Sequence, residues 1–479
     1  MKTKKTSPFI VAVLPIIVMA VVMGVGFGKY RFSVEVLLIL VSFFTIILAM
    51  LYGTTWSEIS DAVSEKIGKS FMAIFIFVFV GMIIGTWMLS GTIPMMIYYG
   101  LKLLSPSLFL VSAFIITTIV SVCTGTSFGS VGTVGLALIG VASGLGVNMA
   151  AAAGSIISGA YFGDKMSPLS DTTNLAPVAA GTTLFEHIRH MFYTTVPATI
   201  LCLVVYFIAG RSASIVSTGE AIAAAEMING LSATFNFNIL LLIPLIIVLV
   251  GSAMGKPTIP VMFTASFVAA ILAMVFQGAT IGSTITAAFG GFKMNMLPNL
   301  NVEVIPSAVQ SLIQRGGMSS IMTTVLKVLC AFLFAGAMSA AGFMDVILNK
   351  LKTFVHSDGT LILITVIATF IVGIVVGNAY IPILLCGELF KDAFKERNLD
   401  AKNLSRTLED AGTCVIPLVP WSAGGAYMAA TLGVATWDYL PWAIFCYTGF
   451  LFAILWGFTG FGIAKLKDVQ LQDKINIKA

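Results

Sequence analysis

The sequence predicts an all-α protein that crosses a membrane several times. Of its 479 residues, 58% are hydrophobic and 10% are charged, and the mean hydropathy is +1.02. A water-soluble protein carries roughly 25% charged residues, so a chain this poor in charge cannot cover a particle of its size with polar surface. Apolar runs long enough to cross about 30 Å of hydrocarbon recur along it, and in lipid such runs form helices. We therefore expect the lipid bilayer, and no nucleic acid, as the surroundings of a chain with net charge +5.

The first expected span runs from Phe9 to Phe27 and follows a short segment with three lysines. Such an amino end is similar to a signal peptide, but no small-residue cleavage site follows it. We interpret it as a transmembrane helix whose basic end lies in the cytoplasm.

Further apolar runs predict spans at residues 36–52, 71–89, 191–209, 237–254, 258–276, 323–341, 361–376 and 441–463. Residues 56–69 mix acidic and basic side chains with regularly spaced apolar ones. This pattern favours an amphipathic connector that lies at the membrane interface and does not cross.

Two places in the chain predict broken helices. No Asp, Glu, Lys or Arg occurs between Leu103 and Gly163, yet Gly, Ser and Thr interrupt this run, most densely at 124–130. A polar break at 163–174 follows directly. Irregular backbone at membrane depth persists only where protein or a wet cavity covers it, so we expect re-entrant hairpins or interrupted helices at both places.

The chain also repeats itself at an offset of 252 residues. Gly125 matches Gly377, and the pair Pro168 and Ser170 matches Pro420 and Ser422. A constant offset through several Gly, Pro and Ser positions predicts a structural repeat of the kind found in secondary transporters.

The two copies differ in charge. Residues 388–410 contain five basic side chains, whereas the matching residues 136–158 contain no charge. Because positive segments stay in the cytoplasm, we expect the copies to be inverted in the membrane and the basic carboxyl end to be cytoplasmic. The expected units are 1–69 (first helices and connector), 70–210 (first repeat), 211–317 (connecting helices and loops), 318–463 (second repeat) and 464–479 (basic tail).

The breaks are where we expect chemistry, because hydroxyl, amide and freed carbonyl oxygens suit a dehydrated hard cation. The predicted cation and proton site is formed by Asp164, Asp171, Thr126, Ser127, Ser170, Thr172, Thr173 and Asn174, with Na+ as the suspected metal ion. A predicted substrate or second cation site is formed by Asn378, Asp410, Thr413, Ser422 and Gly424.

The acidic residues of these sites have structural alternatives. A carboxylate inside the membrane is costly unless it is paired or functional, and it can hold either a proton or a metal cation. Asp164 could instead pair with Lys165, Asp171 could cap the helix after Pro168, and Asp410 could lie at a solvated helix end.

Four other residues, His187, His190, Lys327 and Trp421, also allow two interpretations each. His187 and His190 could sense pH, but a cluster at a helix entrance is more typical of an interfacial anchor. Lys327 could pair with an acid or extend to the interface, and Trp421 could line a pocket or plug the second break. The six cysteines form no CxxC pair, so we interpret them as core residues.

At these residues the sequence resembles a known family. The run GDKMSPLSDTTNLAP at 163–177, with 124–129 upstream and 377–382 downstream, resembles the NhaC family of sodium/proton antiporters, which includes malate/lactate antiporters and is similar to the ion transporter superfamily. The resemblance implies scaffold helices, two re-entrant hairpins and an elevator motion, and it implies contacts of the Ser, Thr and Asn side chains at the breaks with sodium or substrate. The second break, Pro420–Gly425, lacks the acid and threonines of the first, so two equivalent cation sites are not implied.

The predicted function is that of a secondary antiporter which exchanges Na+ for H+ across the cytoplasmic membrane, without a cofactor and as a homodimer. The alternative is a sodium- and proton-coupled exchanger of malate, lactate or another organic acid, in which helix N-termini bind the carboxylate. An enzyme with Asp164 and Asp171 as a catalytic pair is disfavoured because no HExxH, GxSxG or nucleotide loop occurs. A channel is a further, less favoured class.

Overall fold

The computed structural model describes residues 7–30, 32–212, 218–298 and 305–466. Within these ranges the chain is helical apart from turns and one isolated bridge between Leu399 and Lys465. The α-helices are α1 (Phe9–Val22), α2 (Val34–Leu51), α3 (Trp56–Ser90), α4 (Thr92–Leu103), α5 (Phe109–Thr124), α6 (Ser127–Ser130), α7 (Leu136–Gly144), α8 (Met149–Met166), α9 (Asp171–Ala180), α10 (Leu184–Ser212), α11 (Thr218–Thr234), α12 (Ile243–Ala253), α13 (Thr258–Gln277), α14 (Ile281–Gly290), α15 (Ser307–Ile313), α16 (Met322–Ala340), α17 (Phe343–Lys352), α18 (Asp358–Val376), α19 (Tyr380–Glu396), α20 (Ala401–Gly412), α21 (Ala423–Leu432), α22 (Thr436–Tyr439) and α23 (Ile444–Thr459).

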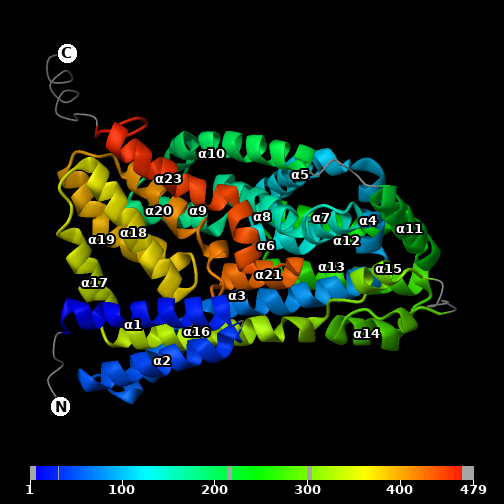
Figure 1. Ribbon diagram of the computed structural model, residues 1–479, viewed down its shortest axis with the longest axis horizontal. Coiled ribbons are helices and arrows are strands. Elements are labelled where there is room, and N and C mark those ends of the chain that lie inside the picture. Colours follow the sequence, from blue (N-terminus) through cyan, green and yellow to red (C-terminus); the bar gives the residue numbers. More distant parts are fainter. Residues whose placement is uncertain (1–6, 31, 213–217, 299–304, 467–479) are drawn as a thin grey trace.

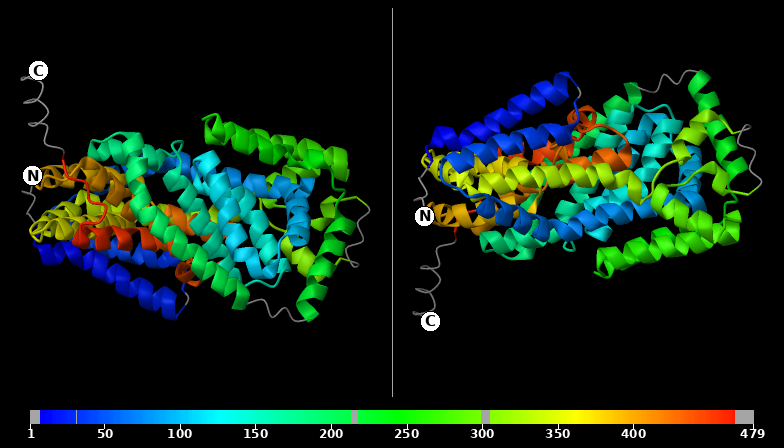
Figure 2. Two further views of the ribbon diagram at one scale, coloured as in Figure 1. Left: turned by 90° about the horizontal axis from the view of Figure 1, so that it is seen from above. Right: turned by 90° about the horizontal axis from the view of Figure 1, so that it is seen from below.

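Among the described residues, nine helices are long and apolar enough to cross a membrane, or up to twelve spans if each bent helix pair counts as one. The expectation of an all-α protein with many membrane spans is therefore confirmed. The long helices α3 and α16 run side by side along the longest axis, and the interrupted helices lie above them in Figure 1. Helices α1 and α2 and the pair α12–α13 flank opposite sides of the molecule (Figure 2).

The connector expected at 56–69 is not an element of its own, because these residues form the first part of the continuous helix α3. The Thr55 side chain accepts a hydrogen bond from the Glu58 backbone in a capping box, and no proline interrupts the helix after it. Val63 packs against Gly336 of α16, where an added Cβ would lie 2.3 Å from the valine side chain. The apolar stripe of this segment therefore faces protein.

Two expected spans are shorter than predicted. The run 237–254 contains a 3-10 turn and then the 11-residue helix α12, which is bent by 103° from the helical residues 224–234. The run 441–463 contains α23, which begins only at Ile444 after a 55° bend. Pro244 lies in the first turn of α12, and Pro441 lies in the 3-10 turn directly before α23. Each proline disrupts continuation from the preceding segment.

The helix breaks occur where the sequence predicts them. Helix α5 ends at Thr124, because Gly125 has φ +66°, a left-handed conformation that glycine adopts at little cost. At the matching position of the second copy, α18 ends at Val376 before Gly377, which has φ +71°. The non-helical residues 167–170 separate α8 from α9.

Helix boundaries recur at the offset of 252 residues. Helix α8 begins at 149 and α20 at 401, and α9 spans 171–180 where α21 spans 423–432. The residue before each of α8 and α20, Asn148 and Asp400, caps its helix through a side-chain oxygen. The sequence repeat thus coincides with repeated local structure.

Two glycines bring α8 into backbone contact with α5. A Cβ added to Gly159 would lie 2.3 Å from the Phe114 carbonyl oxygen, and one added to Gly163 would lie 2.4 Å from the Ser121 Cβ. The Ser121 hydroxyl also donates a hydrogen bond of 2.6 Å to the Ala160 carbonyl. This close packing fixes the break after α5 beside the carboxyl-terminal end of α8.

Candidate functional site

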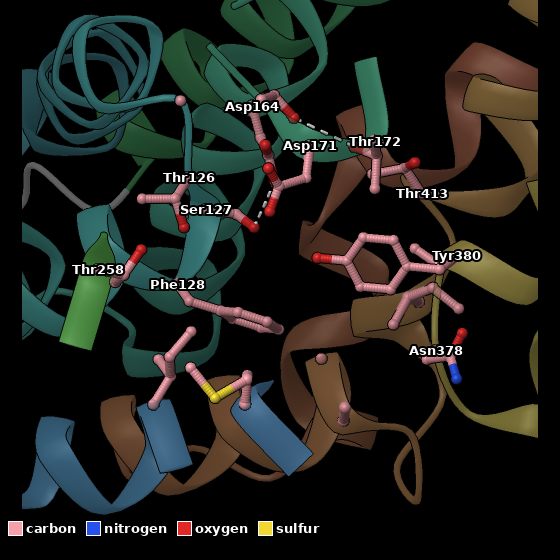
Figure 3. A pocket seen from close by; sticks show the side chains of 18 of the residues that line it. Thr126, Ser127, Phe128, Asp164, Asp171, Thr172, Thr258, Asn378, Tyr380 and Thr413 are labelled. Carbon is pink, nitrogen blue, oxygen red and sulfur yellow. Dashed lines mark hydrogen bonds between the residues drawn. The ribbon is translucent and has the colours of Figure 1, made fainter. Parts of the chain in front are cut away.

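A cavity of about 560 Å³ lies where the breaks of the two copies meet. Five helices begin at its wall: α6 and α9 from the first copy, α19 and α21 from the second, and α13 from the segment between the copies. Figure 3 shows side chains from both copies directed into this space. The observed lining contains nine of the predicted site residues: Thr126, Ser127, Asp164, Ser170, Asp171, Thr172, Asn378, Thr413 and Gly424.

Two carboxylates face this cavity from one side. Asp164 is half-buried near the end of α8, and Asp171 is the exposed first residue of α9. The Ser127 hydroxyl donates a hydrogen bond of 2.7 Å to Asp164 Oδ2, and the two acids and this serine lie close together in Figure 3. The N-cap of α9 is Ser170, so Asp171 is not the capping residue. The cavity therefore holds two acids, and one hydroxyl is already hydrogen-bonded to Asp164.

Several polar side chains at the breaks accept hydrogen bonds from the first turn of a helix. The Thr126 hydroxyl accepts a hydrogen bond from the Gly129 backbone, and the Asn378 side-chain oxygen accepts one from the Ile381 backbone at 3.1 Å. Each cap satisfies a helix donor and fixes the direction in which the helix leaves the cavity.

Four predicted site residues lie outside the lining. Thr173 donates to the Asp164 and Lys165 carbonyls, both at 3.0 Å, and Asn174 donates to the Pro168 and Ser170 carbonyls, so these two shape the break. Ser422 is buried and caps α21 by accepting from Gly425 at 2.9 Å. Asp410 is the fourth.

Asp410 forms an ion pair with Lys165, and both side chains are 0% exposed. This pair joins α20 of the second copy to α8 of the first. It overturns two alternatives drawn from the sequence: Lys165 does not pair with Asp164, and Asp410 does not lie at a solvated helix end. Glu409 is also 0% exposed, and its Oε1 accepts a hydrogen bond of 3.1 Å from Thr172.

Sequence reasoning missed several cavity residues. Lys69 comes from α3, and Lys256 and Thr258 come from the tip between α12 and α13. Phe128 and Tyr161 complete the wall near Ser127. No local signal marks these positions, because their place in the site depends on how distant helices pack.

The structure also shows the contacts of the two histidines, Lys327 and Trp421. His187 Nδ1 lies 2.9 Å from the Ser405 hydroxyl and His190 Nε2 lies 3.1 Å from Asn403 Oδ1, and both rings are buried in the protein. Lys327 lies 4.0 Å from Glu35. Trp421 donates its indole N–H to the Ile374 carbonyl at 2.9 Å and does not line the cavity.

Within the described residues no group of three or more His, Cys, Asp or Glu side chains could hold a metal ion. A cation in the cavity would therefore be held by the Asp164 and Asp171 carboxylates together with hydroxyl and carbonyl oxygens, the ligand types of hard monovalent and divalent cations.

Comparison with known proteins gives consistent matches. The sequence model of the Na+/H+ antiporter family matches residues 159–461. A Haemophilus influenzae protein named as an uncharacterized Na+/H+ antiporter is 48% identical over 95% of this chain and 96% of its own length. The Na+/H+ antiporter NhaC of Alkalihalophilus pseudofirmus is 39% identical over 86% of this chain and 87% of its own. The malate-2H+/Na+-lactate antiporter of Bacillus subtilis is 35% identical, with 87% of each chain covered.

Proposed function

The chain belongs to the Na+/H+ antiporter family, and we propose on this basis that it exchanges Na+ for H+ at the cavity where the two helix breaks meet. It is a multi-pass membrane protein of the NhaC type. The single observation that carries the site assignment is that Asp164 and Asp171 face one cavity together with the Ser127 hydroxyl.

The proposed exchange is a competition for these carboxylates. With the acids ionised, their oxygens and the neighbouring hydroxyls bind a dehydrated sodium ion. When a carboxylate takes up a proton, it loses its negative charge and becomes a poor cation ligand, so sodium leaves. If the cavity opens alternately to the two sides, sodium moves one way and protons the other.

We further propose that the two copies form inverted repeats with re-entrant hairpins and that access alternates by an elevator motion. Two observations support this: helix boundaries recur at the offset of 252 residues, and both copies break at the cavity. Helix α1 begins and α23 ends at the same end of the long axis (Figure 1). We place that end in the cytoplasm because residues 388–410 contain five Lys and Arg side chains. We also propose that the protein lies in the inner membrane and forms a homodimer.

The test is transport by the purified protein in proteoliposomes. Replacing Asp164→Asn or Asp171→Asn should abolish sodium-driven proton movement, measured with a pH-sensitive dye inside the vesicles. Asp392→Asn is the matched control, because Asp392 is an exposed acid of α19 outside the cavity lining. Wild-type antiport in both cavity variants would contradict the site assignment.

The size of the cavity favours a second candidate, an organic anion carried together with sodium and protons. A volume of about 560 Å³ is typical of pockets for small organic ligands and far exceeds the space of one ion. Lys69 and Lys256 in the lining and the beginning helices would attract a carboxylate. Uptake of labelled malate or lactate into the same vesicles that depends on sodium would establish it. Uptake that changes with neither the sodium gradient nor the pH gradient would rule it out.

A further inference from the structure

A second cavity, of about 550 Å³, lies apart from the transport cavity and shares no lining residue with it. It is bounded by the first turns of α10, the start of α20 and the backbone of residues 462–464. The transport mechanism proposed above does not use it.

The walls of this cavity are held in place by hydrogen bonds. Glu186, Arg189, His190 and Tyr193 lie three or four residues apart and thus share one face of α10. Opposite them, the Asn403 side chain accepts from the Ala464 backbone at 3.0 Å and donates to its carbonyl at 2.7 Å. The helix α10, the helix α20 and the carboxyl-terminal segment therefore form a fixed frame around the space.

The charge of this frame is positive. Arg189 is exposed and forms no hydrogen bond or ion pair with any residue that the structure describes. Lys402 lies 3.3 Å from Asp400, and both side chains are about a quarter exposed. The one carboxylate of the lining, Glu186, accepts hydrogen bonds from the Thr182 and Thr183 hydroxyls at 3.1 and 3.3 Å.

A third cation lies directly behind the wall. Arg406 follows Lys402 by one helical turn and is 0% exposed. One of its terminal nitrogens donates to the Gly462 carbonyl at 2.9 Å, while its Nε and Nη2 have no hydrogen-bond partner in the described part of the chain. A buried guanidinium with unsatisfied donors adds to the positive potential of the space in front of it.

A cluster of aromatic side chains lies beside this cavity, and one of them, Tyr193, lines it. Tyr193 is 43% exposed and meets Phe461 edge-on at 5.8 Å, and the Trp456 ring lies 4.7 Å from Phe461. Clusters of Tyr and Trp mark the depth of lipid headgroups, and basic pockets between helices on the cytoplasmic side accept the phosphates of anionic lipids.

From these contacts we infer that this cavity binds a phosphate anion through Arg189 and Lys402, with the headgroup of an anionic phospholipid as its source. The bound phosphate joins α10 to α20, and α20 also carries Asp410, the partner of Lys165 on α8. Lipid binding here therefore stabilises the helix junction behind the transport cavity. The inference does not depend on which ion the protein transports.

The experiment measures retained lipid and thermal stability of the purified full-length protein. The probes are cardiolipin, phosphatidylglycerol, phosphatidylcholine and inorganic phosphate, each added to delipidated protein in detergent. The test variant is Arg189→Gln with Lys402→Gln. The matched control, Lys350→Gln with Lys352→Gln, removes the same number of charges from the exposed end of α17.

Anionic lipid should raise the melting temperature of the wild type and the control, whereas phosphatidylcholine should not. The test variant should bind anionic lipid more weakly, by roughly fivefold for each lost charge. An equal rise with inorganic phosphate alone would identify free phosphate as the source. If the test variant and the control respond alike to every probe, the inference is wrong. Should the double variant not fold, Arg189→Gln alone decides the matter, because Arg189 has no partner to lose.

Discussion

Removing one member of the buried Lys165–Asp410 pair should destabilise the folded protein strongly. Both side chains are 0% exposed, so Asp410→Asn leaves the lysine charge, and Lys165→Met leaves the aspartate charge, without its partner in apolar surroundings. Breaking such a pair costs about 3–5 kcal/mol, whereas replacing both members by uncharged groups is often close to neutral. We therefore expect each single variant to lose about 3–5 kcal/mol and the double variant to recover most of that loss.

The chain offers a matched comparison for this cycle. Lys327 lies 4.0 Å from Glu35, and the two side chains are 22% and 21% exposed. Ion pairs that are more exposed than Lys165–Asp410 contribute about 0–1 kcal/mol to the free energy of unfolding. Thermal unfolding in detergent, followed for both sets of single and double variants, measures the two coupling energies. A wild-type melting temperature for Asp410→Asn, or a double variant that is less stable than the sum of the single losses predicts, would refute the reasoning.

Three further predictions concern the elements around the transport cavity. Gly163→Ala should destabilise the folded protein by about 1–3 kcal/mol in thermal unfolding, because the added Cβ would press on Ser121 and the Val122 backbone. Gly68→Ala is the control and should not destabilise the protein, because nothing lies within 4 Å of a Cβ added there. Ser127→Ala removes the donor to Asp164 and should weaken sodium binding by roughly tenfold in a sodium titration of antiport, with Ser127→Thr retaining most of it; equal affinity in Ser127→Ala would remove the serine from the site. Thr172→Val leaves Glu409 Oε1 without its 3.1 Å hydrogen bond and should lower the free energy of unfolding by about 1–3 kcal/mol. Thr172→Ser keeps the hydroxyl and should avoid this loss. An unchanged stability of Thr172→Val would show that water replaces the threonine.

Local signals made the helix breaks predictable. Gly125 and Gly377 adopt positive φ and end their helices, and a single residue type at a helix end suffices to indicate this. The offset of 252 residues depends only on the order of residues, so the correspondence of α9 with α21 could also be predicted. The carboxylates Asp164 and Asp171 could also be predicted as site residues, because they flank one of the breaks.

Contacts between distant segments were not predictable in this way. Asp410 and Lys165 are 245 residues apart, and the acids of α20 follow a basic block that is typical of a solvated helix. Their burial depends on α9, α10, α18, α19 and α23 packing around α20, which no local pattern indicates. Likewise, the close packing of Val63 in α3 against α16 depends on Gly336, and Lys256 joins the cavity only through the placement of α12 and α13.

The ion pair between α8 and α20 also has a mechanical consequence. Sliding these helices past each other would pull a positive and a negative charge apart in a medium that cannot screen them, so the energetic barrier to such sliding is steep. We therefore expect the interrupted helices of both copies to travel as a single rigid body. Any displacement that exposes the ion to the opposite side must then occur at the seam with α3 and α13, from which Lys69 and Thr258 reach the lining.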